Sequence, residues 1–318
     1  MDTYDRVLKI LFRLVRGEEI AVRKLADEHG VSTKSISRDM GKIKDFLAEN
    51  RDLTGNAELA YCYVHKAYRL ISDEFLTNRE LFAVAKTILG ARALSSKAAK
   101  GLIGKFKKFT TADDREKLDE IVRKELYHYP EIKHDCDSIT ENLWRLVNAI
   151  HEKREITIRY YKQDRTYTEK QIQPASLIFM EYYFYLIAYY PGQYEEPRYF
   201  RVDRIKDIIE HRKPTGSKKI PDFDEGLLRK RCQFMYYGPL RKIRFTYSGP
   251  SVQSILDRLP TAKIIERDRG TYTIEAEIHG DGIKMFLLSQ GAYVKVLAPA
   301  DFAEEFKAEI EKILNMYN

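Results

Sequence analysis

The stretch PRYFRVDRI at residues 197–205 constrains the fold of this chain more than any other segment. Arginine and aromatic residues alternate along it, and a period of two is typical of a β-strand, whose successive side chains point to opposite faces of a sheet. The two predicted faces are Arg198, Phe200, Val202 and Arg204 on one side and Tyr199, Arg201, Asp203 and Ile205 on the other. Arginine is rarely buried unless it is paired, so neither side is a plain core face. An arginine row beside aromatic rings suits a polyanion.

Length and composition bound the class of protein. The chain has 318 residues, enough for two or three compact domains. Its three cysteines (Cys62, Cys136, Cys232) are scattered and odd in number, which argues against a disulfide framework and predicts a reducing, cytoplasmic location. The N-terminal segment mixes charges with apolar residues, so neither a signal peptide nor a membrane span is predicted. The net charge of +7 is spread along the chain and is compatible with nucleic-acid binding.

The first 72 residues predict three helices followed by a hairpin. Residues 3–16 have apolar side chains at the spacing of one helical face, and a second short helix ends at Gly30, where glycine can take the left-handed cap. Ser32 is predicted to cap a third helix, from Thr33 to about Leu47. The predicted packing faces are Tyr4, Val7, Leu8, Leu11, Phe12 and Val15 in the first helix, and Ile36, Met40, Ile43 and Leu47 in the third.

The opposite side of the third helix is polar and basic. Lys34, Arg38 and Gly41 point away from its packing face, with Ser37 and Lys42 at the flanks. Such a face suits the major groove of DNA. The alternative is a solvated amphipathic helix. Residues 57–72 predict two short strands around residues 65–67, which would form a wing.

Residues 73–138 are predicted to be connecting helices. Thr77 and Glu80 have the spacing of a capping box, and residues 95–109 form an amphipathic stretch with five lysines, read as a solvated face rather than a DNA contact. The possible zinc ligands between His128 and Asp137 lack a second paired half, so no metal is predicted. The chain has no Gly-rich phosphate loop, G-x-S-x-G or H-E-x-x-H motif, so neither catalysis nor a cofactor is expected.

The second half predicts two β-rich regions. A helix at residues 138–152 is followed by predicted strands at 155–161, 167–180, 182–190, 198–203 and 204–210, the order of an Sm-like five-stranded barrel. Residues 214–221 (PTGSKKIP) read as a linker. Beyond it the order is β-α-β-β-α-β-α, with a tight Arg269-Gly270 turn, which is typical of a ferredoxin-like domain.

Several of these segments resemble bacterial transcription regulators of the WYL family. The resemblance is carried by ITIRYY at 156–161, IQPASL at 172–177, YFYLIAYY at 183–190 and PRYFRVDRI, with Phe184-Tyr185-Leu186 at the place of the family's Trp-Tyr-Leu triplet. Phenylalanine in place of tryptophan removes the indole N–H donor. Residues 283–299 resemble the family's C-terminal extension around Gly291. Residues 1–72, including STKSISRD at 32–39, resemble the winged helix-turn-helix of DeoR-like regulators.

The resemblance implies an α+β multidomain protein. Its predicted domains are a winged helix-turn-helix at 1–72, a helical connector at 73–138, a WYL effector-sensing domain at 139–213 and a ferredoxin-like extension at 214–318. The implied DNA contacts are Lys34, Ser35, Ser37, Arg38, Lys42, Lys66 and Arg69. The predicted effector site consists of Tyr160, Tyr185, Arg198, Arg201 and Arg204, with Asp203 holding one arginine. Arg38 could instead form a local salt bridge with Asp39.

Two functions remain open on the sequence. In the first, the chain is a dimeric regulator that binds a double-stranded operator and senses single-stranded nucleic acid or a nucleotide, as the family resemblance implies for DNA-damage or phage-defence control. In the second, it is an accessory module of a defence or effector complex that binds RNA or single strands, and its N-terminal helices mediate protein contacts. The Lys34 and Arg38 face distinguishes the two.

Overall fold

The computed structural model describes residues 2–72, 76–214, 223–236 and 238–318. The chain divides into two compact units, Met1–Lys133 and His134–Asn318. The predicted linker lies outside the described residues, apart from its first residue. The helices of the first unit are α1 (Thr3–Val15), α2 (Val22–His29), α3 (Thr33–Glu49), α4 (Arg51–Thr54), α5 (Asn78–Ala91), α6 (Ser96–Phe106), the 3₁₀ helix η1 (Lys107–Phe109) and α7 (Ala112–Tyr127). Its strands are β1 (Glu58–Cys62) and β2 (Ala67–Ile71).

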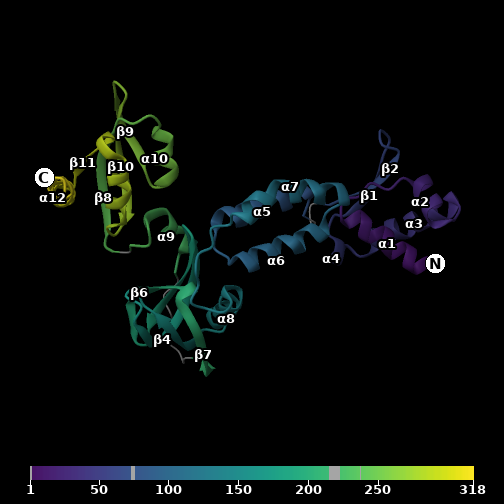
Figure 1. Cartoon of the computed structure of the whole chain (residues 1–318), viewed down its shortest axis with the longest axis horizontal. Helices are drawn as coiled ribbons and strands as arrows, with labels where there is room; N and C mark the ends of the chain where they lie inside the picture. Colours follow the sequence, from purple (N-terminus) through teal and green to yellow (C-terminus); the bar gives the residue numbers. More distant parts are fainter. Residues whose placement is uncertain (1, 73–75, 215–222, 237) are drawn as a thin grey trace. The chain divides into compact units, whose positions relative to one another are not determined.

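The N-terminal part of the first unit consists of α1 to α4 and the β1–β2 hairpin (Figure 1). Gly30 ends α2 with φ +61°, and the Ser32 hydroxyl accepts the Ser35 N–H at 3.1 Å, so both predicted helix boundaries are confirmed. The predicted packing face of α3 is also confirmed, because all four of its residues are buried. Ile20 exchanges two backbone hydrogen bonds with Tyr68, which attaches the α1–α2 connection to the hairpin.

The predicted packing face of α1 is confirmed at Val7 and Leu11, which pack against the core, and wrong at Tyr4, Leu8 and Phe12. Tyr4, Leu8 and Phe12 are each more than half exposed, whereas Ile10 and Leu14 are buried. The helix has apolar residues on two overlapping stripes, and the stripe that includes Ile10 and Leu14 packs against α2 and α3. Arg6 belongs to this buried stripe, where an arginine requires a partner.

The partner of Arg6 is Asp39 on α3. The Arg6 Nε donates to Asp39 Oδ2 at 2.6 Å, with 8% of the Arg6 side chain and 1% of the Asp39 side chain exposed. Two charges removed from water in this way stabilise only when they are paired with good geometry. This ion pair therefore fixes how α3 sits against α1.

The connector is a bundle of α5, α6 and α7. Its core consists of Ala85, Leu89, Ile103, Leu118 and Val122, contributed by all three helices. The predicted capping box is confirmed, since Thr77 Oγ1 accepts the Glu80 N–H and the Glu80 carboxylate accepts the Thr77 N–H. This cap defines the start of α5.

The second unit begins with a helix and a five-stranded antiparallel sheet. Its elements are α8 (Ile139–His151), β3 (Arg154–Tyr161), β4 (Tyr167–Met180), β5 (Tyr183–Tyr190), β6 (Gln193–Arg201), the 3₁₀ helix η2 (Val202–Arg204) and β7 (Ile205–Pro214). The strand order is β6-β5-β4-β3-β7, and α8 contacts β3, β4 and β7. All five predicted strands are present, within a few residues of their predicted bounds.

The sheet does not form the predicted closed barrel. In the described part of the chain, β6 and β7 are the edges of the sheet and no ladder joins them. The sheet nevertheless curls, because Tyr160 on β3 contacts β6, which is separated from β3 in the strand order by β4 and β5. Its hydroxyl accepts the Arg201 N–H at 3.4 Å, and its ring lies edge to face with Phe200 at 5.4 Å.

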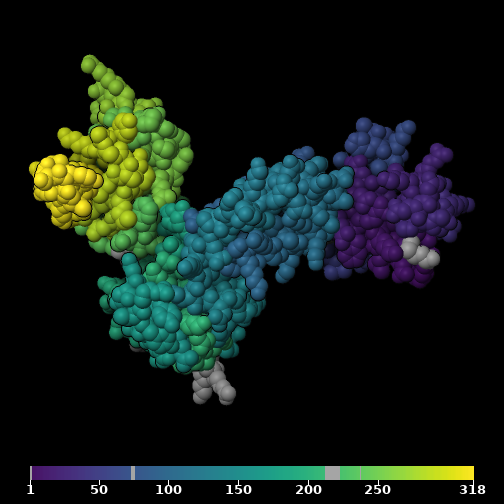
Figure 2. Space-filling view, in the orientation of Figure 1, coloured from purple at the N-terminus to yellow at the C-terminus, as the bar shows by residue number. Residues whose placement is uncertain are grey.

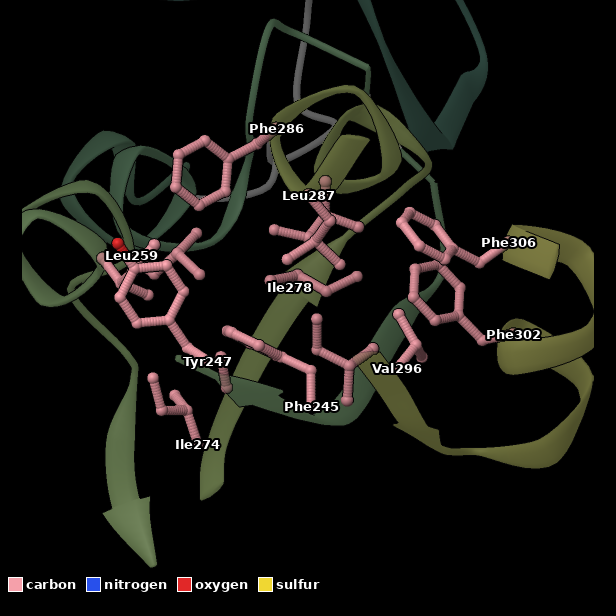
Figure 3. Close-up of a cluster of buried hydrophobic side chains, with 14 residues drawn as sticks. Phe245, Tyr247, Leu259, Ile274, Ile278, Phe286, Leu287, Val296, Phe302 and Phe306 are labelled. Carbon is pink, nitrogen blue, oxygen red and sulfur yellow. The ribbon is translucent and has the colours of Figure 1, made fainter. Parts of the chain in front are cut away.

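The rest of the second unit contains a four-stranded sheet, with α10, α11 and α12 packed on one face, and the helix α9, which precedes the sheet. Its elements are α9 (Glu225–Arg231), β8 (Leu240–Tyr247), α10 (Val252–Arg258), β9 (Lys263–Asp268), β10 (Thr271–His279), α11 (Gly282–Ser289), the 3₁₀ helix η3 (Gly291–Tyr293), β11 (Val294–Ala298) and α12 (Ala300–Asn315). The strand order β11-β8-β10-β9 is that of a ferredoxin-like sheet. Figure 3 shows the core, in which Phe245 and Ile278 of the sheet meet Leu287 of α11 and Phe302 of α12.

Two features of this domain lie at its surface. The hairpin of β9 and β10 projects from the sheet, and its tip is the Arg269-Gly270 turn (Figure 2). The C-terminal helix α12 buries only its first half. None of the described helices has the length and apolar run needed to cross a membrane.

We expect Asp39→Ala to destabilise the three-helix region by about 3–5 kcal/mol, because it leaves the Arg6 guanidinium buried without a partner. Hydrogen exchange on the full chain measures this as lost protection of the α1 and α3 amides, with the β3 amides as an internal reference. Arg38→Ala, one residue away and exposed, is the matched control and should change protection by less than about 0.5 kcal/mol. Equal effects of the two variants would contradict a stabilising role for the pair.

Candidate functional site

The outward face of α3 presents four of the five predicted contact residues on that helix. Lys34, Ser37, Arg38 and Lys42 are exposed. The Lys42 ammonium lies 5.9 Å from the centre of the Tyr4 ring, so it borders the exposed stripe of α1. Ser35 is different, because it is half-buried and its hydroxyl lies 2.9 Å from that of Ser32. Ser35 thus belongs to the helix cap.

Arg38 does not form the local pair considered from the sequence. The Asp39 carboxylate bonds to Arg6 instead, and within the described residues Arg38 has no ion-pair or hydrogen-bond partner. Its guanidinium therefore keeps its donors for a ligand. Asp39 contributes to this surface indirectly, by holding the opposite side of the same helix turn.

The hairpin supplies the two remaining predicted contacts. Lys66 ends the turn between β1 and β2 with φ +51°, and its side chain is exposed. Arg69 lies on β2, opposite Ala60, and is also exposed. Neither arrangement restricts the side chain, so both can reach a phosphate near the hairpin.

In the second unit, two of the predicted effector residues meet at the start of β5. Tyr185 and Arg201 are direct partners across the β5–β6 ladder, so their side chains lie on the same face. The Arg201 guanidinium lies over the Tyr183 ring, with Cζ 3.4 Å from its centre. Tyr183 was not predicted. Its position two residues before Tyr185 places it on the same strand face, which is a signal that the sequence contained.

Asp203 holds Arg201 in place. Arg201 donates through Nε to Oδ1 at 3.1 Å and through Nη2 to Oδ2 at 2.7 Å, and only 3% of the Asp203 side chain is exposed. The Asp203 carbonyl oxygen accepts the N–H groups of Asp135 at 2.8 Å and Cys136 at 3.3 Å. Two of the five guanidinium N–H donors are used, and those on Nη1 remain for a ligand.

The electrostatics of this site keep its phenol neutral. Burial raises the pKa of Tyr185 to about 12, and the Arg201 and Arg204 guanidinium groups act against that shift. Tyr185 is therefore a hydrogen-bond donor at neutral pH. Burial, assisted by the Asp203 charge, likewise raises the pKa of the Cys136 thiol to about 11. Cys136 is thus an unreactive neighbour rather than a nucleophile.

Arg204 completes the cluster. It ends η2, is half-buried and, in the part of the chain that the structure describes, has no ion-pair or hydrogen-bond partner. A half-buried guanidinium without a carboxylate is an uncompensated positive charge, and it lies near enough to Tyr185 to affect the pKa of that phenol. The assembled site consists of Tyr183, Tyr185, Arg201 and Arg204 around Asp203.

The structure does not bring the other two predicted effector residues into this cluster as ligand contacts. Tyr160 is nearly buried, and its ring and hydroxyl pack within the sheet as described above. Arg198 is three residues from Arg201 on a regular strand and lies on the opposite face, where it pairs with Glu196 at 3.3 Å. It lines a separate hollow of about 730 Å³ together with Tyr199, Tyr236 and His279.

The segment between the connector and α8, considered as a metal site, binds other partners. Asp135 accepts from Arg165 at 3.0 Å and Asp137 accepts from Lys206 at 2.8 Å. Among the described residues, no three His, Cys, Asp or Glu side chains are placed to share a metal ion. The segment holds the carbonyl of Asp203, as described above.

Comparisons with known proteins identify two domains in this chain. Residues 141–210 match the WYL domain and residues 241–314 match the WCX domain. No curated protein matches the sequence at a significant level. The Tyr185, Arg201 and Arg204 cluster therefore lies in the WYL domain, and α12 lies almost entirely in the WCX domain.

The solved structures that resemble this chain over nearly its whole length include the following two. One is proteasome accessory factor B/C (PafBC) of Arthrobacter aurescens, at 16% identity and a TM-score of 0.31, with 100% of this chain covering 48% of that one. The other is a CRISPR Cas-related protein, at 12% identity and a TM-score of 0.38. The match covers 99% of this chain and 92% of that one. The chain thus spans about half the length of the PafBC chain. At TM-scores below 0.5, neither likeness defines the fold of the whole chain.

Proposed function

We propose that this protein is a homodimeric, DNA-binding transcription regulator whose WYL domain senses a nucleic-acid or nucleotide effector. In this proposal, α1 to α3 and the β1–β2 hairpin act as a winged helix-turn-helix, and α3 enters the major groove of an operator. The WCX domain, which has a ferredoxin-like strand order, supplies the dimer contact.

The exposed face of α3 carries the proposal. Lys34, Ser37 and Arg38 combine two cations with a short hydroxyl on the N-terminal half of one helix, and side chains of these types recognise base edges and phosphates. The Arg6–Asp39 ion pair holds the buried side of that helix. Because the helix is already held in place, DNA binding would have to order only its exposed side chains and not its backbone.

The cluster around Asp203 supports the sensing function. Arg201 and Arg204 supply planar donors suited to phosphate, and Tyr185 supplies a neutral hydroxyl beside the Tyr183 ring. Aromatic rings next to arginine suit a base and its phosphate together. Binding of such an effector would shift the regulator between states by its differential affinity for them.

The exposed half of α12 supports dimerisation. Phe302 and Phe306 are buried in the WCX core, whereas Ile310, Ile313 and Leu314 continue the same helical stripe and are exposed. At 100° per residue, Lys307 and Glu311 flank one side of the stripe and Glu309 and Lys312 the other. An antiparallel copy of the helix would therefore set lysine against glutamate on both flanks while covering the stripe.

For DNA binding, we expect the double variant Lys34→Ala with Arg38→Ala to lose at least about tenfold in affinity for a duplex selected from a random library with the wild-type protein. A gel-shift titration at fixed salt measures the loss. The control is Arg123→Ala with Lys124→Ala on α7, which removes the same charge from an exposed surface of the same unit. If both double variants bind the duplex like wild type, the N-terminal helices serve another purpose, such as protein contacts.

For the effector site, we expect Arg204→Ala to weaken binding of a labelled single-stranded DNA oligonucleotide by about tenfold or more. Fluorescence anisotropy measures the affinity. Arg204 is the informative position, because its removal breaks no ion pair among the described residues. Arg201→Ala, in contrast, would leave the Asp203 carboxylate buried without a partner. Arg198→Ala is the matched control on the other strand face. A loss in Arg198→Ala, with none in Arg204→Ala, would place the ligand at the 730 Å³ hollow instead.

For dimerisation, we expect Ile313→Asp to convert the protein to a monomer at micromolar concentration, because a carboxylate in the covered stripe would have to be desolvated. Sedimentation equilibrium reports the mass. Ala308→Asp places the same charge on the opposite, exposed face of α12 and should leave the dimer intact. A dimer in both variants would show that the contact lies elsewhere.

A further inference from the structure

A hollow of about 560 Å³ lies in the first unit where the ends of α1 and β2 meet the start of α5. Three arginines from three elements line it. Arg16 directly follows α1, Arg69 lies on β2 and Arg79 lies in the first turn of α5, and all three side chains are exposed. The hollow is separate from the contact face of α3.

The described residues leave the charge in this hollow without an ion pair. The pKa of the neighbouring Glu18 is lowered mainly by its hydrogen bond to Arg13, and Arg16 adds a smaller Coulombic contribution. Within the described part of the chain, none of these three guanidinium groups has a hydrogen-bond, ion-pair or ring partner, whereas Arg6 and Arg13 of the same unit are paired. The two carboxylates that line the hollow bind other groups. Glu19 bonds to His65 Nδ1 at 2.6 Å.

The second carboxylate, Asp114, has three partners. It accepts from Asn78 Nδ2 at 2.5 Å, from Thr111 Oγ1 at 3.0 Å and from Lys117 Nζ at 3.0 Å. These bonds, with Lys117 the leading cause, lower the pKa of Asp114, so it stays ionised and engaged at neutral pH. Three arginines thus line a hollow in which both described carboxylates already have other partners.

The position of Arg79 also favours an anion in the hollow. The first turn of an α-helix is the positive end of its dipole and disfavours a cation, while it favours an anion. Helix α5 has 14 residues, and Arg79 is its second. An anion in the hollow would relieve this repulsion and offer a partner to all three arginines at once.

We infer that this hollow binds a phosphate group. Planar guanidinium donors carried by three separate elements suit the several oxygens of a phosphate better than a halide or a single carboxylate. The group could belong to a phosphate-bearing small molecule or to a phosphodiester of bound duplex DNA, and the chemistry of recognition is the same. In either case the anion would bridge Arg16 and Arg69 of the helix and hairpin region to Arg79 of the connector, and so stabilise one arrangement of the two.

Titration calorimetry of the full chain with inorganic pyrophosphate tests the first source. We expect binding by wild type, at least about tenfold weaker binding by Arg79→Ala, and a smaller loss in Arg79→Lys, which keeps the charge but not the planar donors. Arg123→Ala, an exposed arginine of α7 outside the hollow, is the matched control and should bind like wild type. Unchanged melting temperatures without ligand show that the variants fold.

The salt dependence of duplex DNA binding tests the second source. If a DNA phosphodiester occupies the hollow, Arg79→Ala reduces the slope of log affinity against log salt by about one. If a small molecule occupies it, that slope is unchanged and pyrophosphate does bind. The inference is overturned when Arg79→Ala and Arg123→Ala behave alike in both assays. The Lys34 and Arg38 double variant tests the α3 contact separately. Failure of the proposed DNA-binding function can therefore be distinguished from failure of the phosphate site.

Discussion

The WYL sheet depends on a length constraint at one turn. Strands β6 and β7 are consecutive, and only Val202, Asp203 and Arg204 join them, yet they form opposite edges of a five-stranded sheet. In a flat sheet those edges would be about 19 Å apart, whereas the link from Arg201 to Ile205 spans at most about 14 Å. The sheet must therefore curl until its edges approach each other. The cluster of Tyr183, Tyr185, Arg201 and Arg204 around Asp203 lies at this junction, so its geometry depends on the curl of the sheet.

Two buried aspartates decide which arginines stay available. Asp39 follows Arg38 in the chain but binds Arg6, and Asp203 precedes Arg204 but binds Arg201. A buried carboxylate needs a partner, and the arginine with the better geometry takes that place. The neighbouring arginine is left with its donors free. In both units, then, a buried ion pair holds the element that carries an arginine without a partner among the described residues.

The sequence predicted most elements because their patterns were local. The i, i+4, i+7 and i+11 spacing of α3 and the five-strand run of the WYL domain both agree with the structure. The face of α1 could not be predicted, since Tyr4, Leu8 and Phe12 form as regular a stripe as the residues that are buried, and only Asp39, 33 positions from Arg6, decides between them. Likewise, regular alternation grouped Arg198 with Arg204, but η2 ends the strand after Arg201. The alternation therefore does not extend to Arg204, whose charge acts on the pKa of Tyr185.

Total charge says little about binding in a chain of this kind. The sequence has 55 basic and 48 acidic residues, and they are spread without a basic tail. Many of the basic side chains form ion pairs with carboxylates of the same chain. Arg13 binds Glu18 and Glu28, Arg145 binds Asp207 and Glu210, and Arg201 binds Asp203. A guanidinium that is already paired contributes less free energy to the binding of a phosphate, because the phosphate must compete with the carboxylate partner. The proposed binding surfaces therefore rest on arginines whose nearby described acids already have other partners, namely Arg38, Arg204 and the arginines of the hollow at Arg79.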